Sequence, residues 1–327
     1  MIRIENHPSF ATAETPVLSR DAYLRTKSEK YGWIRNEFYY IPFILDKRAI
    51  FVRMVFTDRV RAFKDGFSAL SAEDEKKFLE ECIQYLKKTK VCDFIAKSQA
   101  NVVFASRPEG AECVPWGTYE IDLSPDAENI LASFDGKHRN VVRKALKDGI
   151  EIVTTDDAEL VYANIKETLK RQNSIHFPSI EYLRELRRNL PESSRFYAAL
   201  DAQGKLQGTA VIVFDRERAY YMYGGSAEHP HAGSLNLLQY KAMLDMKSQG
   251  VGIYDLVGAR LRVAPGSKYE GIQRFKSRFG ATLRSGWAFR VVFNRLKYEA
   301  FNIMTKTYLG LRGYSYEDPI DQIKAAE

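Results

Sequence analysis

The sequence has little cysteine and no long apolar run. Its three cysteines, Cys82, Cys92 and Cys113, are an odd number without a CxxC pair, so neither a disulfide framework nor a zinc site is indicated. No stretch approaches the roughly 20 apolar residues that span a bilayer, and the N-terminal segment lacks the apolar core of a signal peptide. These absences favour a reduced, cytoplasmic protein with no metal and no cofactor. Peripheral membrane contact through a basic surface stays open.

Acidic side chains are scarce in one region. From Arg260 to Lys297 the chain carries ten Lys and Arg residues against Glu270 alone, whereas the whole chain has a net charge of +7. A local positive field of this size suggests a polyanionic substrate, although a solvated helix face is the simpler alternative. The chain has 327 residues, 45% of them apolar and 13% aromatic, which suffices for two domains or one large one.

The second half of the chain shows an alternation of strand and helix patterns. The predicted order is a strand, two helices, three strands, a helix, a strand, a basic helix and further strands. The predicted ranges are 149–153, 157–173, a helix capped by Ser179, 194–200, 206–214, 219–223, 234–248, 253–256, 268–278 and 282–293. Gly224, Gly225 and Ser226 are expected to end the third of the three central strands. This order is the one found in the GNAT acyltransferase fold.

The first half looks like a diverged version of the same plan. A hairpin is predicted from Glu37–Leu45 and Ala49–Phe56, a helix over residues 71–90 with Ser71 as its cap, then strands near 100–105 and 117–123 and a helix from Pro125. The predicted fold class is therefore α+β, with two tandem GNAT-like domains of mixed sheets flanked by helices. The predicted domains are residues 1–136, a diverged N-terminal domain, and residues 137–327, which carry the transfer site.

Five sequence blocks are recognisable in a fixed order. They are residues 137–152 (KHRNVVRKALKDGIEI), 177–183 (FPSIEYL), 219–226 (AYYMYGGS), 254–258 (YDLVG) and 272–280 (IQRFKSRFG). In this order they resemble the FemABX family of non-ribosomal peptidyltransferases, over about half of the chain. The resemblance implies transfer of an amino acid from aminoacyl-tRNA to an amino group of a peptidoglycan precursor stem peptide. No heptad-patterned insertion is visible, so the chain resembles the short members that lack a helical arm.

The resemblance also implies roles for particular residues of the basic helix. Lys276 corresponds to a lysine that contacts the tRNA end, and Phe275 would pack on the terminal adenosine. Asp255 would orient the attacking amine, or cap the following turn. Arginine suits phosphate contact better than catalysis, so the tRNA-binding candidates are Arg274, Arg278, Arg143 and Lys144. The ester donor is already activated, and no protein nucleophile is needed.

For the acceptor substrate, the resemblance implies contacts from two tyrosines, Tyr182 and Tyr223, which match family positions near the sugar-nucleotide and peptide of the precursor. One departure concerns Pro178, because short members that bind the UDP-linked precursor carry an arginine there; His176 also replaces a hydroxyl residue. Recognition of the diphosphate by this loop is therefore in doubt. The candidate substitutes are Arg171, Arg260 and Lys268.

Two other functions stay open. An acyl-CoA N-acyltransferase would bind the pyrophosphate at the N-terminus of the helix after the fourth strand. The segment there, residues 228–234 (EHPHAGS), lacks the leading Arg or Gln and the second small residue of the usual motif. A non-catalytic RNA-binding protein with a vestigial pocket is the second alternative. His229 and His231 flank Pro230, and without further ligands they are interpreted as loop residues.

Overall fold

The computed structural model describes residues 1–12, 14–63, 70–174 and 178–325. They form two compact units, each discontinuous in sequence. The first comprises Met1–Thr118, Gly258–Ser267 and Ser285–Glu327, and the second comprises Tyr119–Val257 and Lys268–Arg284. The prediction drew a single boundary between residues 136 and 137. The two units divide the chain differently because two long strands, β7 (Glu112–Asp122) and β14 (Thr282–Val292), each pass from one unit into the other.

The second unit contains a mixed sheet with the order β8-β9-β10-β11-β12-β7. Its strands are β8 (Glu151–Thr154), β9 (Ser194–Leu200), β10 (Leu206–Phe214), β11 (Arg218–Ser226) and β12 (Ile253–Asp255), with the end of β7. Only β11 and β12 are parallel, and the helix α7 (Ser234–Ser248) connects them. A parallel pair needs such a crossover, which explains the position of α7.

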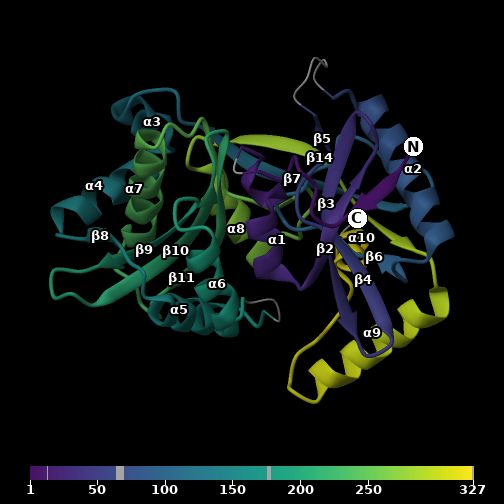
Figure 1. Cartoon of the computed structure of the whole chain (residues 1–327). Coiled ribbons are helices and arrows are strands. Elements are labelled where there is room, and N and C mark those ends of the chain that lie inside the picture. The colour runs from purple at the N-terminus through teal and green to yellow at the C-terminus, as the bar shows by residue number, and fades with distance from the viewer. Residues whose placement is uncertain (13, 64–69, 175–177, 326–327) are drawn as a thin grey trace. The chain divides into compact units, whose positions relative to one another are not determined.

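Helices cover both faces of this sheet (Figure 1). They are α3 (Ala127–Ser133), α4 (Gly136–Lys147), α5 (Ala158–Arg171), α6 (Ile180–Asn189), α7 and α8 (Lys268–Ser277). Gly208 contacts Leu235 of α7, whereas its neighbour Thr209 donates to Asn164 of α5 at 2.9 Å. Adjacent residues of a strand point to opposite faces, so α5 and α7 lie on opposite sides of β10. The longest of these helices, α7, has 15 residues, and the described part of this unit contains no helical arm.

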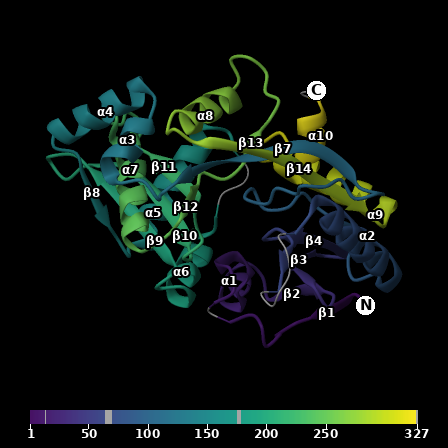
Figure 2. The ribbon, with the colours of Figure 1, turned by 90° about the horizontal axis from the view of Figure 1, so that it is seen from above.

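The first unit repeats this plan. Its sheet has the order β1-β2-β3-β4-β6-β14-β7, with β5 beside β3 and β13 beside β7. The strands are β1 (Arg3–Glu5), β2 (Lys30–Arg35), β3 (Tyr39–Arg48), β4 (Phe51–Phe56), β5 (Arg61–Ala62), β6 (Phe94–Ile95) and β13 (Ala259–Arg260). The helices are the 3-10 turn η1 (Val17–Ser19), α1 (Asp21–Lys27), α2 (Ala72–Thr89), α9 (Arg295–Gly310) and α10 (Pro319–Lys324) (Figure 2). Here α2 connects the parallel pair β4 and β6, as α7 connects β11 and β12.

The strand that follows each parallel pair is exchanged between the two halves of the sequence. In the first unit, β14 pairs with β6, and in the second unit, β7 pairs with β12. Each sheet therefore contains a strand from the other half of the chain. Hydrophobic periodicity reports which residues are buried but not which sheet a strand joins, so the sequence could not reveal this exchange. The predicted fold class, two tandem α+β units with mixed sheets flanked by helices, is confirmed.

Several elements follow the predicted ranges closely. The caps Ser71 and Ser179 accept bonds from Asp74 N and Tyr182 N, as predicted. The predicted end of the strand at Gly224 was wrong, because β11 continues to Ser226 and its residues 223–226 pair with β10. Gly225 is required there by close packing: a Cβ would lie 2.3 Å from Asn164 Oδ1 in α5.

Two further predictions about elements were imprecise. The strand expected near residues 100–105 is only an isolated bridge between Phe104 and Trp287. The helix expected from Pro125 is present but short, because it ends at Ser133, and Asp135 then caps the separate basic helix α4 by accepting from Lys137 N.

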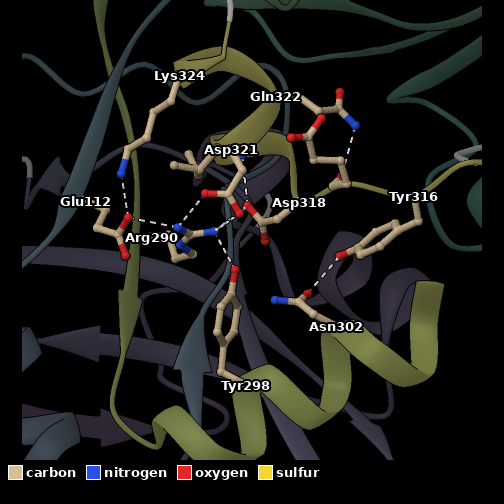
Figure 3. Close-up of polar contacts among 11 residues, drawn as sticks. Glu112, Arg290, Tyr298, Asn302, Tyr316, Asp318, Asp321, Gln322 and Lys324 are labelled. Atoms are coloured by element: carbon tan, nitrogen blue, oxygen red, sulfur yellow. Dashed lines mark hydrogen bonds and ion pairs between the residues drawn. The ribbon is translucent and has the colours of Figure 1, made fainter. Parts of the chain in front are cut away.

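A buried arginine fixes the C-terminal helix of the first unit (Figure 3). Arg290 lies in β14, and its Nη2 donates to Asp321 Oδ1 and Glu112 Oε2, both at 2.8 Å. Its Nη1 lies 2.9 Å from Asp318 Oδ1 and also bonds with Tyr298. Asp318 in turn caps α10 by accepting from Ile320 N at 2.9 Å. The cluster therefore connects β7, β14, α9 and α10.

Candidate active site

The centre of the candidate site is Lys276 near the C-terminal end of α8. The helix is short and carries no fully buried residue, yet Lys276 is half-buried and its Nζ donates to the carbonyl of Val257. Loss of hydration lowers the pKa of Lys276 to about 8, while the negative charge of Asp255 acts in the opposite direction. An ammonium with a pKa near 8 gives up its proton far more readily than an exposed lysine.

The turn that presents the Val257 carbonyl is strained. Val257 has φ of 40°, in the left-handed region that a β-branched residue rarely adopts. The turn is held by Asp255, whose Oδ1 accepts from Val257 N at 2.8 Å. Asp255 therefore caps the turn after β12, as the simpler of its two predicted roles requires. Residues in such conformations persist only where the surroundings impose them.

A buried arginine holds Asp255 in place. Arg218, at the start of β11, donates through Nη1 to Asp255 Oδ2 at 3.1 Å and to Glu120 Oε1 at 2.6 Å. The Asp255 side chain is 2% exposed and that of Arg218 is 5% exposed. Burial alone would lower the pKa of Arg218, but the surrounding oxygens, including both carboxylates, raise it above the ordinary value. The charge is therefore kept, and the contacts form a chain from Arg218 through Asp255 and Val257 to Lys276.

Sequence reasoning missed Arg218 and Glu120. Arg218 is one of two arginines in a charged turn, Asp215 to Arg218, and nothing in the pattern marked it as the buried one. Glu120 alternates with apolar residues in β7, which is typical of an exposed position. The pairing of β7 with β12 places Glu120 opposite Asp255, and two adjacent carboxylates require the guanidinium between them. Glu120 Oε1 also receives Arg284 Nε at 3.0 Å.

Phe275 belongs to an aromatic cluster rather than to an open surface. Its ring lies 4.9 Å from that of Phe279 and 5.6 Å from that of His138, between ring centroids. His138 Nε2 donates to the carbonyl of Phe275 at 3.1 Å, and burial lowers the pKa of His138. A neutral histidine of α4 thus fixes the backbone next to Lys276. The ring of Phe275 remains half-exposed.

The two predicted acceptor tyrosines lie together. The rings of Tyr182 in α6 and Tyr223 in β11 are 6.0 Å apart in an edge-to-face arrangement. Tyr182 is 8% exposed and Tyr223 is half-buried. Pro178 precedes α6 and is buried, whereas His176 and Phe177 lie outside the described residues.

The predicted cationic residues fall into different surroundings. Arg171 donates to the Ser226 carbonyl at 2.7 Å and so holds the end of β11. Lys268 Nζ donates to the Gln172 carbonyl at 3.1 Å. Arg260 lies in β13 of the first unit, where its Nη2 donates to Gln322 at 2.8 Å.

The four predicted tRNA contacts also differ from one another. Arg274 pairs with Glu270 at 2.9 Å and Lys144 with Asp148 at 2.6 Å. In the part of the chain that the structure describes, no ion pair engages Arg143 or Arg278 within 4.0 Å. Arg143 is exposed on α4, and Arg278 is half-buried just after α8.

No group of three or more His, Cys, Asp or Glu side chains could hold a metal ion among the described residues. His231 instead pairs with Asp148 at 3.0 Å, and its backbone N–H donates to Gln207 at 2.7 Å. Within the same residues, no helix has the length and apolar character needed to cross a membrane.

The repeated plan of strands and helices defines a fold of two tandem α+β units. The FemAB family model matches residues 183–306, which include β9 to β12, α8 and Lys276. A curated relative from Weissella viridescens, UDP-N-acetylmuramoylpentapeptide-lysine N(6)-alanyltransferase, is 23% identical over 158 residues. That match covers 46% of this chain and 46% of the relative, so the chain spans about half the length of the curated relative it matches.

Solved structures agree with the fold. The crystal structure of FemX matches with a TM-score of 0.65 at 14% identity, covering 91% of this chain and 99% of the other. A conserved protein of unknown function from Bacteroides thetaiotaomicron matches with a TM-score of 0.56 at 11% identity, covering 89% and 100%. The sequence similarity to the FemAB family therefore covers residues 183–306, and the structural similarity to FemX extends the shared fold over most of the chain.

Proposed function

We propose that this protein is an aminoacyltransferase that moves an amino acid from aminoacyl-tRNA to an amino group of a peptidoglycan precursor stem peptide. The observation that carries the proposal is the chain of contacts from Arg218 through Asp255 and Val257 to Lys276. All four residues lie within residues 183–306, which the FemAB family model matches. The name of the Weissella relative describes alanyl transfer to a lysine of such a precursor, which supports the same class of reaction here.

The reaction requires one bond to form and one to break. The acceptor amine attacks the ester carbonyl, a C–N bond forms, and the carbonyl oxygen becomes an oxyanion. The C–O bond to the tRNA ribose then breaks, and the proton lost by the amine ends on the ribose oxygen. Because the ester is activated, the protein has only to position the substrates, stabilise the oxyanion and move the proton.

Lys276 suits both of the latter tasks. With a pKa of about 8, about nine in ten molecules carry the ammonium at pH 7. An ammonium has three protons, so it can hold the Val257 carbonyl and still face a substrate oxygen. Its lowered pKa also makes it a better proton donor to the departing ribose oxygen than an exposed lysine. Asp255 acts as a positioning residue in this scheme, since its contacts are with Val257 N and Arg218.

The remaining predicted residues divide between the two substrates. On the donor side, the half-exposed ring of Phe275 would stack on the terminal adenosine, and Arg143, Lys144, Arg274 and Arg278 would contact phosphates. On the acceptor side, Tyr182 and Tyr223 would contact the precursor, with Lys268 and Arg260 as candidates for its anionic groups. Arg171 is a weaker candidate because its guanidinium holds the end of β11.

The acyl-CoA alternative is disfavoured by the surroundings of α7. Gly233 caps this helix with φ of 87°, and a Cβ on it would lie 2.2 Å from the Val141 carbonyl in α4. The preceding loop is fixed through His231, which contacts Gln207 and Asp148. A pyrophosphate at a helix N-terminus needs open backbone N–H groups, whereas here the backbone of α4 packs on this end.

The test is a transfer assay with a mixed pool of radiolabelled aminoacyl-tRNAs and either UDP-linked or lipid-linked pentapeptide precursor. We expect label on the precursor that disappears when the tRNA is digested with RNase before the reaction. A parallel reaction with labelled acetyl-CoA distinguishes the acyl-CoA alternative. RNA binding without turnover from either donor would favour the non-catalytic alternative and overturn the proposal.

A further inference from the structure

One face of α9 is apolar and exposed. Five large apolar side chains in and just after this helix are at least half-exposed: Leu296 (81%), Ile303 (64%), Met304 (52%), Tyr308 (53%) and Leu311 (86%). Leu296, Ile303 and Leu311 follow one another at intervals of seven and eight residues, about two turns of an α-helix. They therefore lie on the same side. We call these five residues the α9 face.

The α9 face is not the surface that attaches the helix to its unit. Tyr298 and Phe301, which are buried on the inner side of α9, pack with Phe51 and Phe94 in an aromatic cluster, and Tyr308, seven residues after Phe301, lies at the edge of the α9 face. Lys297 adds a bond to Asp93 at 2.9 Å. The helix is therefore held in place by its inner side, and the apolar outer side needs another explanation.

The α9 face is bordered by positive charge. Residues 294–316 contain four cations, Arg295, Lys297, Lys306 and Arg312, and a single acid, Glu299. Glu299 pairs with Arg295 at 2.8 Å, so its charge is neutralised. Lys306 and Arg312 are exposed, and no ion pair engages either within the described residues.

The tip of the β3–β4 hairpin extends this surface. Ile50, 67% exposed, is at the tip, and its carbonyl accepts from Lys297 Nζ of α9 at 3.2 Å. Lys47 and Arg48 precede it and are exposed. Figure 1 shows α9 crossing this hairpin near its tip. Apolar and cationic side chains thus alternate over two adjacent elements of the first unit.

We propose that the α9 face and the tip of the β3–β4 hairpin bind the surface of an anionic lipid bilayer, with α9 lying in the plane of the interface. A helix with one apolar side flanked by Lys and Arg is suited to this position, because the apolar side enters the acyl boundary while the cations meet the headgroups. A second copy of the chain is a poorer occupant. A symmetric contact through the same patch would bring Lys306 and Arg312 of both copies together without a carboxylate to pair them.

The consequence for the reaction rests on the proposed function. A protein held at a bilayer meets a lipid-linked precursor at a high local concentration, and it gains nothing for a precursor that diffuses freely. The proposal therefore selects the lipid-linked acceptor over the UDP-linked one.

The test is co-sedimentation of the full chain with vesicles. One set mixes phosphatidylcholine with phosphatidylglycerol, and the other contains phosphatidylcholine alone. We expect binding to the mixed vesicles that weakens with added salt.

Leu296→Ser combined with Ile303→Ser should weaken this binding more than about tenfold. Lys306→Gln combined with Arg312→Gln should weaken it about fivefold for each cation removed. Leu160→Ser, at an exposed leucine of α5, is the matched control and should bind like the parent protein.

Several outcomes would overturn the proposal. The parent chain could fail to sediment with mixed vesicles, or the Leu296 and Ile303 variant could bind as well as the control. If that variant instead abolishes a dimer seen by sedimentation velocity without vesicles, the occupant is a second copy. Vesicle binding needs neither tRNA nor precursor, so its failure leaves the transfer reaction standing. Vesicle binding with no transfer would refute only the proposed function.

Discussion

The two units each contain a buried arginine with at least two carboxylates, but the two clusters end in different structures. Arg290 of the first unit contacts Glu112, Asp318 and Asp321, and through them it fixes α10. Arg218 of the second unit contacts Glu120 and Asp255, and through them it fixes a strained turn and Lys276. Both guanidinium side chains are 5% exposed, so burial alone does not separate them.

The two clusters differ in the group at which their contacts end. Around Arg290 three carboxylates and a tyrosine surround the two terminal nitrogens of one cation, and Lys324 completes the cluster by donating to Glu112 at 2.5 Å. Every charge there has a structural partner. Around Arg218 the contacts lead to an ammonium whose pKa is lowered to about 8. A titratable group with a lowered pKa at the end of a fixed network is a candidate functional group, whereas the charges around Arg290 are balanced within their own cluster.

The largest effect is expected at the closed cluster. Arg290→Met leaves the buried Asp318 without its cation, whereas Glu112 and Asp321 are partly exposed to water. We therefore expect a loss of stability near the lower end of the about 3–5 kcal/mol that breaking a buried ion pair on one side costs. Urea unfolding of the variant and its parent would measure this loss. The transfer rate per folded molecule, and its dependence on pH, should stay unchanged. A changed pH profile in this variant would contradict the contrast between the clusters.

Replacing Lys276, at the end of the contacts that start at Arg218, should slow catalysis and leave stability unchanged. Lys276→Met keeps the length of the side chain but deletes the charge, and loss of one oxyanion-stabilising group slows chemistry about 10²–10³-fold. Stability should not fall, because a poorly hydrated ammonium is removed. Single-turnover transfer together with the urea midpoint would measure both. Lys166→Met, at an exposed lysine of α5, is the control and should retain nearly the parent rate.

The sign of the pH dependence follows from the lowered pKa of Lys276. Between about 8 and the ordinary 10.5, the unfolded chain binds a proton that the folded chain does not. This residue therefore makes stability rise with pH across that window. Catalysis should show the opposite trend, since transfer that uses the ammonium falls as pH rises through about 8.

Asp255→Asn sharpens this prediction. The Asp255 carboxylate raises the pKa of Lys276 against the effect of burial, so its removal should move the falling limb of the rate profile to lower pH. The amide can still accept from Val257 N, which keeps the turn. A falling limb that stays in place in this variant, with only a uniform loss of rate, would mean that Lys276 does not titrate in the profile.

The sequence predicted much of this fold for physical reasons that are local. Ser71 and Ser179 cap their helices because a serine before an apolar repeat accepts a backbone bond wherever the helix packs. The exchange of β7 and β14 between the units could not be predicted, because it depends on pairing between distant segments. The same limit applies to the site. Lys276 could be named from its block, whereas Arg218 and Glu120 become visible only when β7 pairs with β12.

The smallest effect is expected for tRNA binding at the surface of α4, where one cation is in an ion pair and its neighbour is not. Lys144 pairs with Asp148 at 2.6 Å, whereas no ion pair engages its neighbour Arg143 within the described residues. A cation that contacts a phosphate releases a counterion, and its loss reduces the salt slope of tRNA binding by about one. Arg143→Gln should therefore weaken tRNA binding a few-fold at low salt and flatten the slope, while Lys144→Gln should change both the affinity and the slope less.

Filter binding of aminoacyl-tRNA over a range of salt concentrations would measure the two slopes. Equal slopes would show that pairing with Asp148 does not withhold Lys144 from the tRNA, and two slopes that both match the parent would place the tRNA away from α4.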